Sequence, residues 1–427
     1  MNREIENLMH LIQASPSPFH TILECEKQLQ EVHAVKLDKA AKWNLSSGNI
    51  YYTNLYDTTL IAFRVNAGYQ AGDGVRIAAS HTDWPCLRIK PSAETVTGSY
   101  AKLNVEVYGG PILNTWLDRP LSVAGKVVLK GENPFRPRIC YVDFARPILT
   151  IPNLAIHMNR EVNKGVELNR QTDMLPLAGM VQETLEKDQY FMNALAAELS
   201  ADPSSILGYD LCIYNAEAPC LTGLKEEFLS GPRLDNLTSV QACLSGLLRS
   251  GRERGIDIIA MFDNEEVGNM TKQGAPVFKH VLERISLGLG LSREEHLQAM
   301  MDSFMVSADV GHAVHPNKPE LNDITNKNYL NGGFLIKMAC SQSYATDCEA
   351  DGIVEGLCQK YEIPYGKFLN RSDLRGGSTL GSFSSSDLSM MTADVGVPLL
   401  AMHSARELMG VKDQETLTCM IEKVFSE

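Results

Sequence analysis

The chain has 427 residues, of which 44% are hydrophobic and 21% are charged, an ordinary globular balance with enough material for two or three domains. Its formal net charge of −13 and the lack of a Lys/Arg run argue against nucleic-acid partners and against binding to anionic membranes. No stretch reaches the ~18 apolar residues of a membrane span, so we expect no membrane partner.

The ten cysteines contain no Cys-x-x-Cys pair, which excludes a thiolate zinc ribbon. The opening MNREIENLMHLIQ has the pattern of an amphipathic helix rather than of a secretion signal. We therefore expect a cytoplasmic protein with reduced thiols.

The first part of the chain predicts two helices followed by short strands. These elements are a helix with Ile5, Leu8 and Ile12 on one face, a second helix at 20–32, and strands at 50–52, 60–65 and 76–80. From about 92 to 224, short alternating runs such as 103–108 and 123–130, punctuated by glycine and proline, are typical of a β-rich module.

After residue 225 the pattern alternates between helix and buried strand. A helix carries Leu237, Val240, Leu244 and Leu247 on one face, and apolar strands are predicted at 256–262, 305–308 and 397–402. This pattern predicts an α/β domain with a mixed sheet and helices on both faces. We expect that domain to combine residues 1–91 with 225–427, interrupted by a β-rich insert at 92–224.

Polar segments with metal-binding side chains stand at the ends of these strands, where ligands bind in open α/β sheets. Taken alone, each has an ordinary explanation: His-x-Asp at 81–83 is a weak motif, Asp235 is placed as a helix N-cap, and the pair 265–266 could be a charged turn. A lone histidine such as His403 is more often structural. Their coincidence in one chain favours a metal site.

Together these residues predict two metal sites that share one carboxylate. His81, Asp235 and Asp309 satisfy one ion, and Asp235, Glu266 and His403 satisfy the other. Spacing alone leaves open which carboxylate bridges and which histidine meets which ion. This nitrogen and oxygen set suits zinc, with manganese or cobalt as alternatives.

Two ions ~3.5–4 Å apart can hold a bridging hydroxide and polarise a carbonyl. Glu265 is then placed as the general base that takes the proton of the water, and Asp83 orients His81.

The same segments match a known family. The chain resembles the aspartyl aminopeptidases, dizinc exopeptidases, in segments that follow the family order across nearly the whole chain. These segments are SHTDWPCLRIKP (80–91), NTWLDRPLSVAGKV (114–127), IPNLAIHMNREVN (151–163), GPRLDNL (231–237), DNEEVGN (263–269), SADVGHAVHPN (307–317), SYATD (343–347) and DVGVPLLAMHSARE (394–407).

The resemblance implies the same five metal ligands, with Glu265 as general base and Asp83 as the carboxylate that orients histidine. It also implies a dimerising role for the insert, and dimers that build a tetrahedral dodecamer. His157 falls on a histidine that reaches into a neighbouring subunit's site, although an ordinary partly buried histidine is an equal alternative. Lys337 falls beside the substrate side-chain pocket.

His312 stands beside Asp309 and could shape the pocket, although packing is the simpler explanation. We assign Asp118 to an ion pair with an arginine. The chain departs from many family members at Asn269 and across residues 382–387, a stretch expected near the substrate.

We therefore expect a metallo-aminopeptidase that acts on the N-terminal bond of peptides, with a preference for N-terminal Asp or Glu. The alternatives are a dimetal amidohydrolase of N-blocked amino acids and a non-catalytic binding protein.

Overall fold

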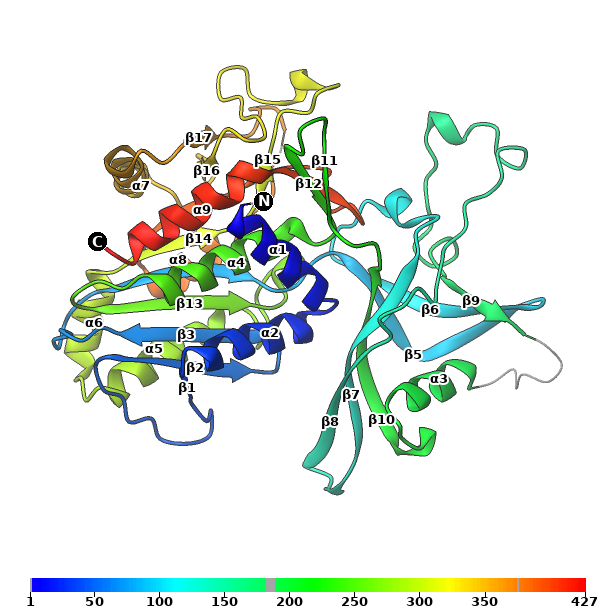
Figure 1. Ribbon diagram of the computed structural model, residues 1–427, viewed down its shortest axis with the longest axis horizontal. Coiled ribbons are helices and arrows are strands. Elements are labelled where there is room, and N and C mark those ends of the chain that lie inside the picture. The colour runs from blue at the N-terminus through cyan, green and yellow to red at the C-terminus, as the bar shows by residue number, and fades with distance from the viewer. Residues whose placement is uncertain (1, 182–188, 375) are drawn as a thin grey trace.

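The computed structural model describes residues 2–181, 189–374 and 376–427, whose strands form three sheets (Figure 1). The largest sheet has nine strands in the order β1-β2-β3-β13-β4-β14-β18-β16-β17. Its strands are β1 (Val35–Lys36), β2 (Asn49–Leu55), β3 (Thr59–Val65), β4 (Val75–His81), β13 (Ile256–Phe262), β14 (Phe304–Ala308), β16 (Phe334–Lys337), β17 (Tyr365–Phe368) and β18 (Met391–Gly396). The strands expected at 50–52, 60–65, 76–80, 256–262 and 305–308 are confirmed.

The centre of this sheet is parallel. β13 and β14 flank β4 in parallel, and β18 continues the parallel set beyond β14, whereas β3 and β16 close it with antiparallel pairs. Consequently β4, β13 and β14 all end at the same edge of the sheet. That edge is where an open α/β sheet binds its ligands.

Helices cover both faces of the sheet, as predicted. One face is packed by α1 (Arg3–Ala14), α2 (Pro18–Glu31), α4 (Leu234–Arg249), α7 (Cys348–Tyr361) and α9 (Val411–Val424), and the other by α5 (Pro276–Gly288), α6 (Arg293–Met301) and α8 (Leu380–Leu388) (Figure 1). Alternate residues of one strand enter different cores: Ala62 of β3 belongs to the first core, whereas Ile61 and Phe63 belong to the second. The two-residue period of a strand produces this division.

A six-stranded antiparallel sheet lies beside this α/β body in the order β8-β7-β10-β5-β6-β9 (Figure 1). It consists of β5 (Cys86–Thr97), β6 (Tyr100–Tyr108), β7 (Leu121–Asn133), β8 (Arg136–Asp143), β9 (Leu177–Met180) and β10 (Ile206–Asn215), with helix α3 (Tyr190–Glu198) packed against it. The sheet starts at Cys86, before the boundary expected at residue 92. Residues 182–188 of the expected insert lie outside the described residues.

The third sheet has five strands and includes one of the strands predicted from the sequence. It contains β11 (Cys220–Thr222), β12 (Phe228–Gly231), β15 (Gly311–His312), β19 (Pro398–Leu400) and β20 (Glu407–Gly410). The strand expected at 397–402 is present as β19, shortened to Pro398–Leu400, but it belongs to this smaller sheet, whereas the preceding strand of the largest sheet is β18, which ends at Gly396. Pro398 lacks the N–H that a continuous ladder would need, so the chain changes sheets there.

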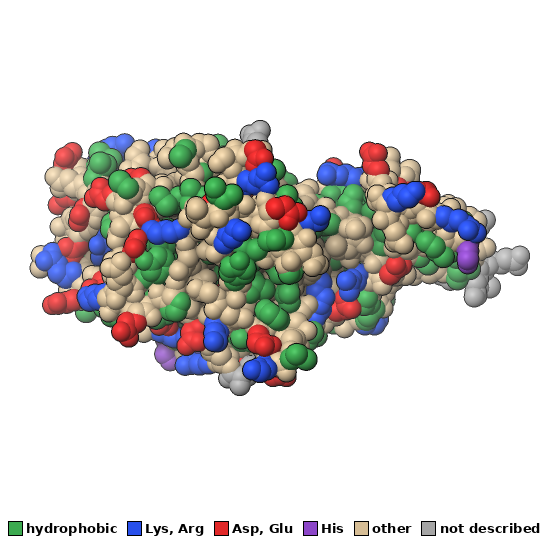
Figure 2. Space-filling model, turned by 90° about the horizontal axis from the view of Figure 1, so that it is seen from above, with side chains coloured by type: hydrophobic (Ala, Val, Ile, Leu, Met, Phe, Trp, Pro, Cys, Tyr) green, Lys and Arg blue, Asp and Glu red, His purple; other side chains and the backbone are tan. Residues whose placement is uncertain are grey.

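Among the described residues, no helix has both the length and the apolar character needed to cross a bilayer. On the face seen in Figure 2, Lys and Arg side chains are interspersed with Asp and Glu.

Candidate metal centre

The predicted ligands reach one place from two sheets. His81 is the last residue of β4, Glu265 and Glu266 lie in a short turn after β13, and Asp309 follows β14. The parallel register sets His81 opposite Phe262, the last residue of β13, so these strand ends are level. Two further ligands come from the five-stranded sheet.

Asp235 follows β12 at the start of α4, and His403 lies in the turn after β19. The connection from β12 to Asp235 and the turn that carries His403 each contain a residue with left-handed backbone, with φ of +61° at Arg233 and +66° at His403. These tight turns direct Asp235 and His403 toward the edge of the larger sheet.

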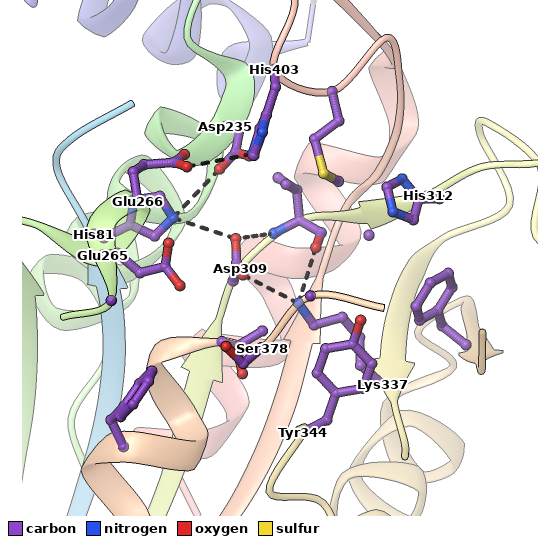
Figure 3. A pocket seen from close by; sticks show the side chains of 18 residues that line it. His81, Asp235, Glu265, Glu266, Asp309, His312, Lys337, Tyr344, Ser378 and His403 are labelled. Carbon is purple, nitrogen blue, oxygen red and sulfur yellow. Dashed lines mark hydrogen bonds and ion pairs between the residues drawn. The ribbon is translucent and has the colours of Figure 1, made fainter. Parts of the chain in front are cut away.

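The carboxylate of Asp235 lies between the two imidazoles (Figure 3). Its Oδ1 is 3.4 Å from Nε2 of His81, and its Oδ2 is 3.3 Å from Nε2 of His403. His81 Nε2 is also 3.4 Å from Asp309 Oδ1, and His403 Nε2 is 3.5 Å from Glu266 Oε2. Two groups of three ligand atoms therefore share Asp235.

These separations fit zinc. Ligand atoms bound tetrahedrally to zinc at about 2.0–2.1 Å stand about 3.3–3.4 Å from one another. The four nitrogen–oxygen distances here are 3.3–3.5 Å. Within the described part of the chain, Asp235 Oδ1 and Glu266 Oε1 are buried without a hydrogen-bond partner. A buried carboxylate oxygen of this kind requires a cation or a donor.

The electrostatics of the cluster also call for positive charge. Burial raises the pKa of Glu265 to about 8, and the carboxylate of Asp309 adds to the shift. Burial likewise raises the pKa of Glu266, with a further contribution from Asp235. Burial alone would lower the pKa of His403, but the hydrogen bond to Asp235 and the negative charges of Asp235, Glu266 and Glu407 together outweigh this effect and raise it to about 10. Divalent ions would relieve the repulsion among the carboxylates.

Asp83 lies behind His81 and is fully buried. Its Oδ1 is 3.5 Å from Nδ1 of His81, while its two oxygens accept hydrogen bonds from the backbone N–H groups of Glu265 and Glu266 at 3.1 and 3.2 Å. Burial would raise the pKa of Asp83, but contact with His81 holds it below its ordinary value. One carboxylate thus faces the imidazole on one side and holds the glutamate turn on the other.

A cavity of about 400 Å³ opens onto this cluster (Figure 3). Besides the ligands and Glu265, its lining includes His312, Lys337, Tyr344, Phe368, Ser378, Phe383 and Met402. Phe383 belongs to the 382–387 stretch expected near the substrate, and it does reach the cavity.

Lys337 has a closer partner than the sequence indicated. Its side chain is 1% exposed, its Nζ donates to the carbonyl oxygen of Val310 at 3.0 Å, and it lies 3.4 Å from Oδ2 of Asp309. The ammonium lies 5.0 Å from the ring centroid of Tyr344. Lys337 therefore borders the cavity while it also neutralises a predicted metal ligand.

Two other predictions have different outcomes. His157 is exposed in a turn at 155–158, outside the cavity lining. The ion pair expected for Asp118 is wrong: its carboxylate accepts hydrogen bonds from the backbone and side chain of Asn153 at 2.9 and 3.0 Å. The neighbouring Arg119 forms the ion pair instead, with Glu217.

Two residues of the site were missed by sequence reasoning. Glu407 is buried and accepts hydrogen bonds from the backbone N–H groups of Asp235 and His403. Tyr108 donates to Asp83 at 2.6 Å from the six-stranded sheet. Glu407 stands in the quoted segment 394–407, so its proximity to His403 was a usable signal, whereas nothing local distinguishes Tyr108.

Comparisons with known proteins identify the family of the chain. The profile of the family described as "Aminopeptidase I zinc metalloprotease (M18)" matches residues 11–425. A probable M18 family aminopeptidase 2 from Clostridium novyi is 47% identical over 409 residues, covering 95% of this chain and 94% of the relative. Its counterpart from Clostridium acetobutylicum is 43% identical and covers 100% and 99% of the two chains.

Solved structures share the fold. A chain of the cryo-EM structure of the Ape4 and Nbr1 complex superposes with a TM-score of 0.95 at 32% identity, over 99% of this chain and 85% of that one. An M18 aminopeptidase from Thermotoga maritima gives a TM-score of 0.86 at 20% identity, over 99% and 95% of the two chains, which speaks for the fold alone. The family expected from the motifs is confirmed, and the chain belongs to the M18 family of zinc metallo-aminopeptidases.

Proposed function

We propose that the cluster holds two zinc ions: one between His81, Asp235 and Asp309, and one between Asp235, Glu266 and His403. The observation that carries this proposal is the position of Asp235, whose two oxygens face different imidazoles at 3.4 and 3.3 Å. A carboxylate with this arrangement can bridge two ions. The unpartnered oxygens of Asp235 and Glu266 support the same assignment.

The bound ions would polarise the scissile carbonyl and lower the pKa of the attacking water. Glu265 lines the cavity beside the ligands and would accept the proton of that water at its carboxylate. It would then donate the proton to the nitrogen of the departing amine. Asp83 holds His81 from behind and fixes the turn that carries Glu265. The products are a free amino acid and a shortened peptide.

The substrates we propose are peptides with a free N-terminus, preferably Asp or Glu. Lys337 supports the acidic preference because its ammonium borders the cavity, where a substrate carboxylate would gain from its charge. Ser378 adds a hydroxyl to the same lining. Phe383 and Phe368, the residue paired with Lys337 across β16 and β17, supply apolar walls, and the Lys337 ammonium is the favoured partner for the acidic group.

We also propose a homo-oligomer, with dimers that assemble into a dodecamer. The loop around His157 exposes Leu154, Ile156 and Met158 by 60%, 49% and 74%, an apolar surface that a second subunit would cover. A structure entitled "Structure of S. cerevesiae mApe1 dodecamer" shares the fold. His157 would then reach a neighbouring site. All ten cysteines are free, which accords with a reducing, cytoplasmic location.

The test is hydrolysis of the p-nitroanilides of Asp, Glu, Leu and Ala by zinc-loaded protein, beside Glu265→Gln. We expect the wild type to release p-nitroaniline, fastest from Asp or Glu, and the variant to lose activity by about 100-fold to 10,000-fold. Zinc content measured by atomic absorption should stay at two ions per chain in both. Retention of full activity by Glu265→Gln would contradict the assigned base.

An N-acetylated Asp p-nitroanilide separates the aminopeptidase from an amidohydrolase of blocked amino acids. The aminopeptidase should cleave only the free amine. Faster cleavage of the acetylated compound would replace the proposed function with the alternative, and no turnover of either by protein with two bound zinc ions would favour a binding protein.

A further inference from the structure

A short segment at the end of β6, residues 108–110, contacts both halves of the metal centre. Tyr108 contacts Asp83, Gly109 lies against Glu266, and the carbonyl of Gly110 faces His403. This segment comes from the six-stranded sheet, whereas the predicted ligands come from the other two sheets. The β-rich sheet therefore forms part of the wall of the site.

The first contact acts on His81 through Asp83. The Tyr108 hydroxyl donates to Asp83 Oδ2 at 2.6 Å, a short charge-assisted hydrogen bond. The hydroxyl oxygen in turn accepts a hydrogen bond from Nδ2 of Asn264 at 3.0 Å. Nδ1 of His81 lies 3.1 Å from the backbone carbonyl oxygen of Asp83 and 3.5 Å from its Oδ1, so the position of Asp83 governs how the imidazole presents Nε2.

The sheet itself holds the tyrosine ring in place. In the β5–β6 ladder Tyr108 is opposite Cys86, and Arg88 is two residues further along β5, so Arg88 and Tyr108 share a face of the sheet. The Arg88 guanidinium lies 3.8 Å from the ring centroid of Tyr108, within the range of a cation–π contact. This packing restricts the ring that carries the hydroxyl.

The second half of the segment acts on His403. Gly110 O lies 3.1 Å from Nδ1 of His403, so a proton on Nδ1 would be donated to this carbonyl and would leave Nε2 free for a ligand bond. Gly109 has φ of +71°, and a Cβ there would lie 3.2 Å from Cβ of Glu266. The chain can pass this close to Glu266 because Gly109 lacks a side chain.

We propose that the segment 108–110 positions both imidazoles of the metal centre, with Tyr108 acting as a positioning residue through Asp83. The six-stranded sheet thereby sets the geometry of the catalytic site in addition to any role in assembly. This inference rests on the proposed function, in which the two imidazoles bind zinc. It goes beyond that function because it predicts that residues without metal contact affect zinc binding and kcat.

The main test compares Tyr108→Phe with Tyr209→Phe in the full-length, zinc-loaded protein. Both changes keep the ring and remove one hydroxyl of the six-stranded sheet; that of Tyr209 donates to the carbonyl of Lys90 at 2.7 Å, away from the site. We expect Tyr108→Phe to weaken zinc binding or lower kcat by about 10-fold to 100-fold. KM should change less than kcat, and Tyr209→Phe should match the wild type in both.

Two readouts separate positioning from general stability. Zinc affinity is measured by competition with a chromogenic chelator, and the visible absorption of cobalt-substituted protein reports ligand geometry directly. Tyr108→Phe should alter the cobalt spectrum, while its thermal unfolding temperature should match that of Tyr209→Phe. A Tyr108→Phe protein whose zinc affinity, kcat and cobalt spectrum match those of Tyr209→Phe would overturn the proposal.

A second pair tests the glycine contact. Gly109→Ala and Gly98→Ala both place a methyl group on a residue with positive φ, but the space around Gly98, at the far end of the β5–β6 hairpin, is open. We expect only Gly109→Ala to lower zinc affinity, and equal affinity in the two variants would contradict the proposal. Failure of the wild type to bind zinc would instead defeat the proposed function, so the two failures are distinguishable.

Discussion

Glu407 accepts a hydrogen bond from the backbone nitrogen of Asp235 at 3.0 Å, although the two residues are far apart in the chain. Its other oxygen accepts the backbone N–H of His403 at 2.8 Å. One buried carboxylate thus ties together two of the proposed zinc ligands through their backbone N–H groups. Burial raises the pKa of Glu407 to about 8, and the neighbouring Asp235 carboxylate acts in the same direction.

Replacing Glu407 with Gln should weaken zinc binding by about 10-fold to 100-fold, because an amide NH₂ group would face one of the two backbone donors. Competition with a chromogenic chelator measures the change. Asp413→Asn is the matched control: Asp413 is also a buried carboxylate, and it accepts the backbone N–H groups of Asn331 and Gly333 at 2.8 and 2.9 Å, away from the site. Unchanged zinc affinity in Glu407→Gln would show that the two hydrogen bonds accepted by Glu407 are dispensable for zinc binding.

Asp413 also predicts a pH dependence of stability. Burial raises its pKa from 3.8 to about 7, so the folded protein binds this proton more tightly than the unfolded chain does. The stability that the protonated Asp413 carboxyl contributes is fully present below pH 3.8 and is lost as the pH rises through 7. Relative to Asp413→Asn, the wild type should therefore lose unfolding free energy between pH 5 and 7. Urea unfolding at several pH values measures the difference in unfolding free energy between the two proteins. A difference that grew in favour of the wild type between pH 5 and 7 would contradict the prediction.

Lys337→Met should reduce activity in two separable ways. Loss of the ammonium leaves Asp309 Oδ2 without its neighbouring charge, which should slow turnover of every substrate. An additional loss of about 10-fold to 100-fold in kcat/KM is expected for the Asp and Glu p-nitroanilides, because charge-assisted contacts are worth about 1.5–3 kcal/mol. The ratio of Asp to Leu turnover isolates this second effect. An unchanged ratio would restrict Lys337 to supporting Asp309.

Gly352→Ala and Gly356→Ala should each stabilise the protein by about 0.5–1 kcal/mol, since alanine loses less backbone entropy than glycine in a helix. Both glycines are exposed on α7, and an added Cβ meets nothing within 4 Å. Thermal unfolding measures the gain. Gly396→Ala should instead destabilise the protein, because its Cβ would lie 1.5 Å from the carbonyl oxygen of Asp309. A lower unfolding temperature for Gly352→Ala would contradict the prediction.

Much of the fold could be predicted because its signals are local. Helix α1 follows from apolar residues at helical spacing, and β13 follows from a continuous apolar run between polar segments. The strand expected at 397–402 is present as β19, and Pro398 after Val397 marks the point where the chain leaves the largest sheet. The start of the six-stranded sheet at Cys86 carries no such mark, because β5 follows closely on the His81 segment without a compositional change.

By itself the sequence determined which residue types stand at the strand ends, since an apolar run that stops at His81 or Asp309 places those side chains at the edge of a sheet. It also determined the family, through motifs distributed along nearly the whole chain. Only the tertiary structure decided which atoms meet: Asp235 between two imidazoles, Glu407 behind two ligands, and Tyr108 against Asp83. Such contacts depend on strand order, on register and on the packing of one sheet against another, and these arise from interactions between distant segments that no local pattern encodes.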